Sequence, residues 1–146
     1  MKARNYIKLE FPGISDNEGF ARSAAAGFAS QLDPTLDELS DIRTAVSEAV
    51  TNCIVHAYPD LTGRILMKMS IYEGGELEIV IRDWGRGIAD IETAMQPMYT
   101  SGGEERSGMG FTIMESFMDS LKVESEPDVG TTVTMRRTIK QRESSR

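Results

Sequence analysis

Ser47-Glu48-Ala49-Val50-Thr51-Asn52 lies in the middle of a segment, residues 36–58, in which apolar side chains recur at helical spacing. At about 100° per residue, one stripe of this predicted helix is apolar and consists of Leu39, Ile42, Val46, Val50 and Cys53. Glu48 and Asn52 fall on the opposite side, one turn apart. That side is lined by Ala45 and Ala49 and lacks the lysines and arginines that usually cover a solvated helix face. The stretch therefore predicts a helix that presents a polar pair.

The pair Glu48 and Asn52 has two interpretations. A carboxylate can accept a proton or hold a metal-bound water, and an amide oxygen is a hard ligand suited to Mg²⁺. A glutamate and an asparagine on an exposed helix face can have the same spacing, so the pair taken alone favours that simpler interpretation. His56 follows Asn52 by one further turn, and its role is left open. The rest of the chain decides between the two interpretations.

Length, charge and cysteine content limit the class of protein. The 146 residues suit one domain, predicted over residues 1–139, with a disordered charged tail at residues 140–146. The 16 basic and 23 acidic residues leave a net charge of -7, which argues against a nucleic-acid or anionic-membrane surface and suits a basic protein partner. The single cysteine excludes a disulfide within the chain. No apolar run is long enough to span a membrane, so a soluble cytoplasmic protein is expected.

Strands are predicted wherever apolar residues alternate with polar ones. The segments with this pattern are residues 7–11, 65–71, 77–81, 121–125 and 130–138. Pro12-Gly13 ends the first strand. The second and third strands are joined by Gly74-Gly75, which predicts a hairpin whose turn uses the positive φ that glycine tolerates.

Two capping boxes mark the starts of the first two helices. Ser15 with Glu18 opens one helix, and Thr35 with Glu38 opens the long helix described above. The first helix carries Phe20, Ala24 and Phe28 on one line and the small residues Ala21, Ala25 and Ala29 on another. Small residues let another backbone or a second subunit come close, but ordinary core packing is the favoured reason for them.

Two glycine motifs follow the hairpin. Asp83-Trp84-Gly85-Arg86-Gly87 comes directly after a strand, where the glycines allow either a sharp turn or the close approach of a ligand. Gly108-Met109-Gly110 leads into an apolar-periodic helix, whose free N–H groups would seat a phosphate. Between the motifs, a short helix is expected over residues 90–95. Residues 97–107 are a candidate for a mobile lid, and the alternative is a loose connection.

The chain contains no Walker motif and no His-Arg-Asp loop, which excludes two common nucleotide architectures. The ordered set of Glu-x-x-x-Asn on a helix, Asp-x-Gly-x-Gly after a strand and Gly-x-Gly before a helix resembles the ATP-binding domain shared by gyrase, the mismatch-repair ATPases and sensor histidine kinases. The resemblance spans residues 7–139. It implies the Bergerat-type α/β fold, a two-layer sandwich whose mixed, largely antiparallel sheet is covered on one face by helices.

A narrower resemblance rests on residues 32–35, 47–52 and 105–111, which look like the corresponding stretches of the bacterial anti-sigma factor serine kinases, and most of all the sporulation type that acts on sigma F. This implies a protein that binds and inhibits a sigma factor of RNA polymerase and uses ATP to phosphorylate a serine of an anti-anti-sigma protein. The alternatives are the same chemistry directed at a general-stress sigma factor, a binding module without catalysis, and a histidine-kinase-type catalytic domain. The last would need a separate phosphoacceptor histidine, and the one histidine here is His56.

The catalytic roles follow from the resemblance. Glu48 would be the general base for the attacking serine hydroxyl, and Asn52 would hold Mg²⁺ through its amide oxygen. Arg106 would neutralise charge on the transferred γ-phosphoryl group. The alternative for Arg106 is a surface arginine paired with Glu104 or Glu105.

The resemblance also implies a set of ATP or ADP contacts. Asp83 would accept a hydrogen bond from the adenine amino group, Gly85 and Gly87 would let the backbone pass close to the base, and Thr132 would be a second adenine contact. Trp84 either shields the base or packs on a neighbour. The predicted phosphate-side contacts are Thr100, Ser107, Gly108, Met109 and Gly110.

Partner contacts are predicted at the first helix. In the resembled family this helix contributes to both sigma-factor and anti-anti-sigma contacts, and Arg22 is the position favoured here. Its alternative is an ordinary solvent-facing arginine. The family also implies a homodimer joined near the first strand, residues 7–11, and the first helix. No nucleic-acid or membrane contact is expected.

Overall fold

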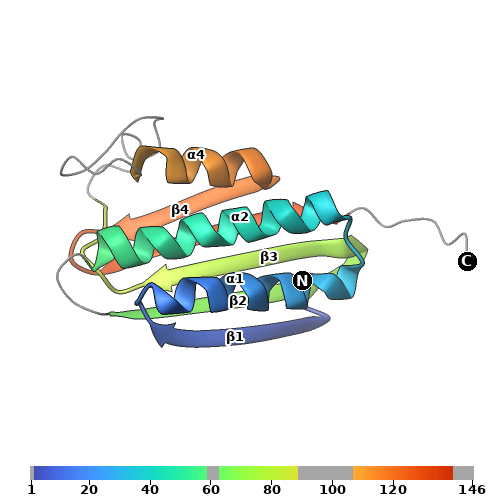
Figure 1. Ribbon diagram of the computed structural model, residues 1–146, viewed down its shortest axis with the longest axis horizontal. Coiled ribbons are helices and arrows are strands. Elements are labelled where there is room, and N and C mark those ends of the chain that lie inside the picture. The colour runs from blue at the N-terminus through green and yellow to red at the C-terminus, as the bar shows by residue number, and fades with distance from the viewer. Residues whose placement is uncertain (1, 59–62, 89–106, 140–146) are drawn as a thin grey trace, which may run out of the picture.

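The computed structural model describes residues 2–58, 63–88 and 107–139. Figure 1 shows one sheet with the described α-helices side by side on one of its faces. The helices are α1 (Asp16–Ala29), α2 (Leu36–Asn52) and α4 (Ser107–Phe117). The strands are β1 (Asn5–Pro12), β2 (Arg64–Tyr72), β3 (Glu76–Asp83), β4 (Ser120–Glu126) and β5 (Gly130–Thr138). Short helical turns occupy Ser30–Leu32, Cys53–Ala57 and Glu73–Gly75, and the second of these is a π-helix.

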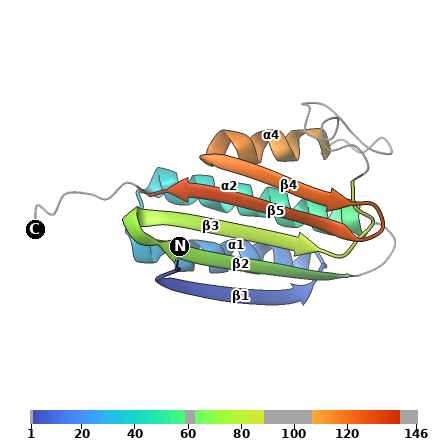
Figure 2. The same ribbon diagram turned by 180° about the vertical axis from the view of Figure 1, so that it is seen from behind.

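The sheet has the strand order β1-β2-β3-β5-β4, and every pairing between its described strands is antiparallel. The predicted α/β fold with a largely antiparallel sheet and helices on one face is confirmed. The parallel pair that a mixed sheet would need does not occur among these strands. Figure 2 shows the other face of the sheet, over which none of the described helices lies.

The core lies between the sheet and the helices. Its sheet side consists of the alternate strand residues that face the helices. Alternate residues of β2 and β3 point toward the helices and are at most 1% exposed: Ile65, Met67, Met69, Ile71, Leu77, Ile79 and Ile81. The apolar stripe of α2 covers them with Ile42, Val46 and Val50, each fully buried. The predicted alternation and the predicted stripe of α2 are therefore both confirmed.

Helix α1 packs through its alanines. Ala21, Ala25 and Ala29 are fully buried in the core of the chain itself, so they are not available to a second subunit. Phe28 is also buried, but Phe20 is 59% exposed. Ala24 packs against the core beside Phe28. Core packing, the favoured reason for the small residues of α1, is therefore confirmed, because the alanines let α1 approach the rest of the core closely.

Only one of the two predicted capping boxes forms. The Thr35 hydroxyl accepts a hydrogen bond from the Glu38 N–H at 3.0 Å, and Glu38 Oε1 accepts one from the Thr35 N–H at 2.8 Å. The box at Ser15 is wrong, since the Ser15 side chain makes no capping hydrogen bond. Glu18 accepts a hydrogen bond from the Ser47 hydroxyl at 2.6 Å instead, which ties α1 to α2.

The hairpin prediction is confirmed, and two element boundaries move. Gly74 and Gly75 have φ of 81° and 82°, as the turn between β2 and β3 requires. Helix α2 changes to the π-helix after Asn52, and α4 begins at Ser107, so the Gly108-Met109-Gly110 motif lies inside its first turn. The expected helix at 90–95, the lid up to residue 106 and the tail at 140–146 fall outside the described residues.

The described helices include none that is long and apolar enough to cross a membrane.

Thr35→Ala should lower the free energy of unfolding by about 1 kcal/mol, because it removes the hydroxyl that accepts the Glu38 N–H. Ser15→Ala is the matched control and should change it by less than about 0.5 kcal/mol, since Ser15 makes no capping bond. Urea unfolding of both variants measures the difference. If both variants lose the same free energy of unfolding, the conclusion that only Thr35 forms a capping box is wrong.

Candidate active site

The site is organised around Asp83, the last residue of β3. Its side chain faces the helices and the residue is 5% exposed. Oδ1 accepts hydrogen bonds from two backbone N–H groups, that of Gly85 at 2.9 Å and that of Thr131 at 3.2 Å. Because both donors use the same oxygen, Oδ2 retains the capacity to accept from a ligand.

Burial raises the pKa of the Asp83 carboxyl, against the lowering effects of the Gly85 amide, the Cys53 thiol and the Thr131 amide. The Cys53 thiol donates a hydrogen bond to this carboxyl. Burial, and then the Asp83 charge, raise the pKa of Cys53 well above its ordinary value, so Cys53 is a neutral donor. The end of the predicted catalytic helix is thus in contact with the end of β3.

Asn52, the residue before Cys53, faces the third motif. A Cβ built on Gly110 would lie 3.0 Å from Nδ2 and 3.1 Å from Oδ1 of Asn52, so the two residues are neighbours across α2 and α4. Gly108 and Gly110 are in the first turn of α4, where backbone N–H groups have no partner within the helix. The structure therefore brings the amide of Asn52 to the turn predicted to seat phosphate.

Glu48 lies one turn before Asn52 on α2 and is half-buried. It lines a groove of about 420 Å³ between α1 and α2. The other lining residues are Arg22, Ser23, Ser40, Arg43, Thr44 and Ser47. Arg22, the predicted partner contact, is exposed and forms an ion pair with Glu18 at 3.7 Å. Glu48 and Asn52 thus lie one turn apart on the same side of α2, where Glu48 lines the groove and Asn52 lies beside Gly110 of α4.

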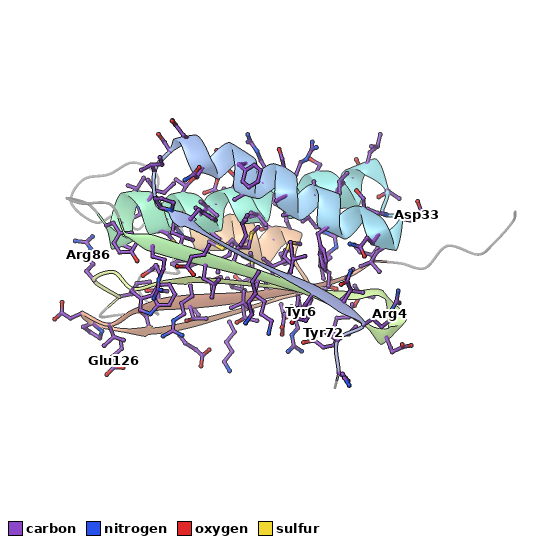
Figure 3. The ribbon with its side chains drawn as sticks, turned by 90° about the horizontal axis from the view of Figure 1, so that it is seen from below. Arg4, Tyr6, Asp33, Tyr72, Arg86 and Glu126 are labelled. Carbon is purple, nitrogen blue, oxygen red and sulfur yellow. The ribbon has the colours of Figure 1, made fainter. Side chains whose placement is uncertain are left out.

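The glycines of the Asp83 motif are required by packing within the chain. A side chain on Gly85 would overlap the Ala57 carbonyl at the end of the π-helix, and one on Gly87 would overlap the Glu126 carbonyl. Gly87 also has φ of 75°. Figure 3 shows Arg86 and Glu126 at the same end of the sandwich, away from Asp33. This loop and the β4–β5 turn therefore form one end of the sandwich. A contact between Gly85 or Gly87 and the adenine base stays a prediction.

The structure does not bring Thr132 to Asp83. In the antiparallel register Asp83 pairs with Thr131, and Thr132 pairs with Arg82. Because side chains alternate between sheet faces, Thr132 lies on the open face, away from the buried carboxylate. A contact between Thr132 and adenine stays a prediction. The threonine that lies beside Asp83 is Thr131, whose hydroxyl bonds to that of Ser125 at 2.7 Å.

Ser125 is a residue that the sequence reasoning missed. Its hydroxyl accepts the Ile88 N–H at 2.7 Å and so holds the chain just beyond the Asp83 motif. A serine in an alternating strand carries no local signal for this role. Trp84 packs on neighbours: the guanidinium carbons of Arg64 and Arg82 lie 3.8 and 4.7 Å from its ring centre. His56 is half-buried in the π-helix.

The remaining predicted contacts are only partly within the described residues. Thr100 and Arg106 lie outside them. Ser107 and Met109 are described by their backbone alone, in the first turn of α4. Their predicted contacts with phosphate stay predictions.

Comparison with known proteins gives one family. A family model described as the histidine kinase-like ATPase domain matches residues 16–137. The chain is 57% identical over 134 residues to an anti-sigma F factor of Clostridium kluyveri, covering 91% of this chain and 94% of that protein. It is 53% identical over 140 residues to an anti-sigma F factor of Thermoanaerobacter pseudethanolicus, covering 95% and 97%.

Solved structures share the fold at low sequence identity. The RsbU and RsbW domains of a Mycobacterium tuberculosis protein match with a TM-score of 0.68 at 17% identity, over 92% of this chain and 32% of that one. The mycobacterial sensor histidine kinase MprB matches with a TM-score of 0.59 at 16% identity, over 93% and 100%. These two similarities concern the fold alone.

Asp83→Asn should make the nucleotide-free protein more stable at pH 7 than the parent. Burial raises the pKa of Asp83 in the folded state above its value of about 4 in the unfolded chain. The parent therefore begins to lose stability at about pH 4 and continues to lose it until the pH has passed the raised pKa. The carboxamide oxygen that replaces the carboxylate can still accept both backbone N–H groups. Urea unfolding between about pH 3 and 8 measures the difference, which should vanish at the acid end. A variant less stable than the parent at pH 7 would contradict this account.

Proposed function

We propose a function for this chain, which belongs to the histidine kinase-like ATPase domain family and within it to the anti-sigma F factors. The protein binds and inhibits a sporulation sigma factor. With ATP, it phosphorylates a serine of the anti-anti-sigma antagonist. Its cofactors are ATP or ADP and Mg²⁺. Its setting is the cytoplasm, where RNA polymerase works, and it acts as a homodimer.

One observation carries the nucleotide part of this proposal. Two consecutive residues, Asn52 and Cys53, contact the other two motifs: Asn52 lies against Gly110 and Cys53 bonds to Asp83. Three motifs separated along the chain thus meet at one end of the sandwich. A purine on Asp83 and phosphates at the start of α4 would lie on either side of the end of α2, an arrangement that supports ATP as the ligand.

The residues fit adenine and magnesium by their donor chemistry. A carboxylate accepts hydrogen bonds and does not donate them, so Asp83 suits the 6-amino group of adenine and not the 6-carbonyl of guanine. The Asn52 amide oxygen is a suitable Mg²⁺ ligand, and the missing Cβ of Gly110 leaves room beside it. When bound, Mg²⁺ would neutralise negative charge on the phosphates.

Phosphoryl transfer follows from the same groups. The acceptor serine oxygen forms a bond to the γ-phosphorus, the bond from that phosphorus to the β–γ bridging oxygen breaks, and ADP leaves. Glu48 takes the proton of the serine hydroxyl. The N–H groups of Gly108 and Gly110 and the Arg106 guanidinium stabilise the phosphate oxygens.

The acceptor protein reaches Glu48 through the α1–α2 groove. Glu48 lines this groove together with two arginines and four hydroxyl-bearing residues. Asn52 lies one turn further along the same side of α2, beside α4, so an acceptor in the groove and phosphates at the start of α4 would both be near Glu48. The groove suits an extended segment that carries the serine and acidic neighbours, which Arg22 and Arg43 would pair with.

The alternatives differ in what they predict. The same chemistry directed at a general-stress sigma factor would leave the site unchanged and alter only the partner. A histidine-kinase-type catalytic domain would transfer phosphate to histidine, and the similarity to sensor histidine kinases concerns the fold alone. A binding module without catalysis would form no phosphoserine. Incubation with Mg-ATP and each candidate partner separates these cases.

Glu48→Gln should reduce serine phosphorylation of the antagonist by at least about 100-fold while ATP affinity stays within about threefold, because the amide keeps the shape but cannot take the proton. Phosphoserine formation and calorimetry with Mg-ATP measure the two effects. Asn52→Ala is the complementary variant and should weaken Mg-ATP binding itself. If Glu48→Gln transfers phosphate as fast as the parent, Glu48 is not the base.

Arg43→Ala should raise the KM for the antagonist by about tenfold and leave ATP affinity unchanged, because Arg43 lines only the protein side of Glu48. Arg22→Ala should lower sigma-factor affinity, again without a change in nucleotide binding. Lys122→Ala, an exposed cation on β4, is the control and should alter neither. If both arginine variants keep the parent's KM for the antagonist and its sigma-factor affinity, the groove does not bind these partners.

A further inference from the structure

The Tyr58 hydroxyl joins three parts of the fold at the nucleotide end. It accepts a hydrogen bond from the Trp84 backbone N–H at 2.7 Å and donates one to the Arg64 carbonyl at 2.7 Å. Trp84 is the residue after Asp83, and Arg64 is the first residue of β2. Tyr58 is only 8% exposed, and burial is the main cause that raises its pKa, so the hydroxyl keeps its proton and remains a donor. None of the roles proposed above uses this residue.

Two further contacts hold the same loop. The Arg86 N–H donates to the Ala57 carbonyl at 3.2 Å. Gly85 packs so closely on Ala57 that a Cβ there would lie 2.6 Å from the Ala57 Cβ. The consecutive residues Ala57 and Tyr58 therefore contact all three residues that follow Asp83. Since Gly85 also donates to Asp83 Oδ1, a displacement of this loop changes the position of the carboxylate.

The π-helix connects this contact to the phosphate side of the site. It runs over Cys53–Ala57, directly after Asn52 and directly before Tyr58. A π turn takes one more residue per hydrogen bond than an α turn, and such turns are frequent at functional sites. Here the segment links Asn52, beside α4, to the loop beside Asp83. Tyr58 therefore links the position of Asp83, the proposed base-recognition group, to that of Asn52, the proposed metal ligand.

We infer that Tyr58 is a positioning residue for base recognition: its hydroxyl holds the Trp84 amide, and through the loop the Asp83 carboxylate, in the orientation that accepts the 6-amino group of adenine. The inference rests on the proposed ATP binding. Tyr58 does not touch the nucleotide in this role. Its loss affects the discrimination between purines and leaves the magnesium and phosphate contacts in place.

Calorimetry with the full chain tests the inference. Two ligands are compared in the presence of Mg²⁺: ATP and the purine riboside triphosphate that lacks the 6-amino group. The parent should bind ATP at least about tenfold more tightly than the analogue, as expected for a hydrogen bond to a charged acceptor. Tyr58→Phe should bring this ratio to within about threefold of one, because the carboxylate is no longer held. The magnesium dependence of ATP binding should stay as in the parent.

Matched variants separate positioning from loss of stability. Tyr72→Phe removes the hydroxyl of a tyrosine in β2, which bonds to Glu78 at 3.4 Å, and should keep the parent ratio. Gly63→Ala displaces the Tyr58 ring, since the new Cβ would overlap it, and should reproduce the reduced ratio if Tyr58→Phe does not fold. In the Asp83→Asn background, Tyr58→Phe should have no further effect on the ratio, because both act through one carboxylate.

A parent-like ATP-to-analogue ratio in folded Tyr58→Phe overturns the inference, whatever happens to its melting temperature. Failure of the parent to bind Mg-ATP is a different result: it overturns the proposed function, and this inference with it. A reduced ratio in Tyr58→Phe, with an unchanged ratio in Tyr72→Phe, supports the positioning role.

Discussion

The burial of one carboxylate, Asp83, constrains the rest of this structure. An ionised side chain taken out of water is costly unless hydrogen bonds replace its solvation. Two backbone amides, from Gly85 and Thr131, and the Cys53 thiol supply them. These donors come from the loop after β3, from β5 and from the end of α2. Holding the carboxylate therefore also holds these three segments together, and Asn52, one residue before Cys53, takes its place beside α4 as a consequence.

Close backbone contact is the second requirement, and it explains the glycines better than ligand approach alone. Gly85 packs on Ala57, Gly87 on Glu126, and Gly130 on the Asp83 carbonyl. Any side chain at these positions would push apart the segments that surround Asp83. The site is therefore built from the same contacts that close this end of the sandwich. A protein that keeps a buried carboxylate for ligand recognition gives up some stability of its free form, which is a common compromise at functional sites.

Helix α2 brings the two halves of the proposed reaction together. Asn52 lies beside α4 and its predicted phosphate seat, and Glu48, one turn earlier on the same side of the helix, lines the groove with Arg22 and Arg43. One helical turn between Glu48 and Asn52 is about 5.4 Å, short enough for both to act on one transferred group. The Ser47 hydroxyl bonds to Glu18 and joins α2 to α1 beside this groove, and Glu18 also pairs with Arg22 within α1. Partner binding on α1 would therefore be felt at Ser47, next to Glu48, the proposed general base.

Local sequence determined much of this fold and identified the motifs that meet around Asp83. Alternation at 65–71 and 77–81, the Gly74-Gly75 turn, the Thr35 cap and the stripe of α2 each depend on neighbours within a few residues, and each is confirmed. Tertiary structure alone decided the rest. Glu18 bonds to Ser47 and forms no capping box with Ser15. On α1, Phe20 is exposed while the alanines are buried, and Thr131 is the threonine that pairs with Asp83. Tyr58 was not foreseen at all. In each case partners distant in sequence compete for one group, and the outcome depends on register and packing that no local pattern records.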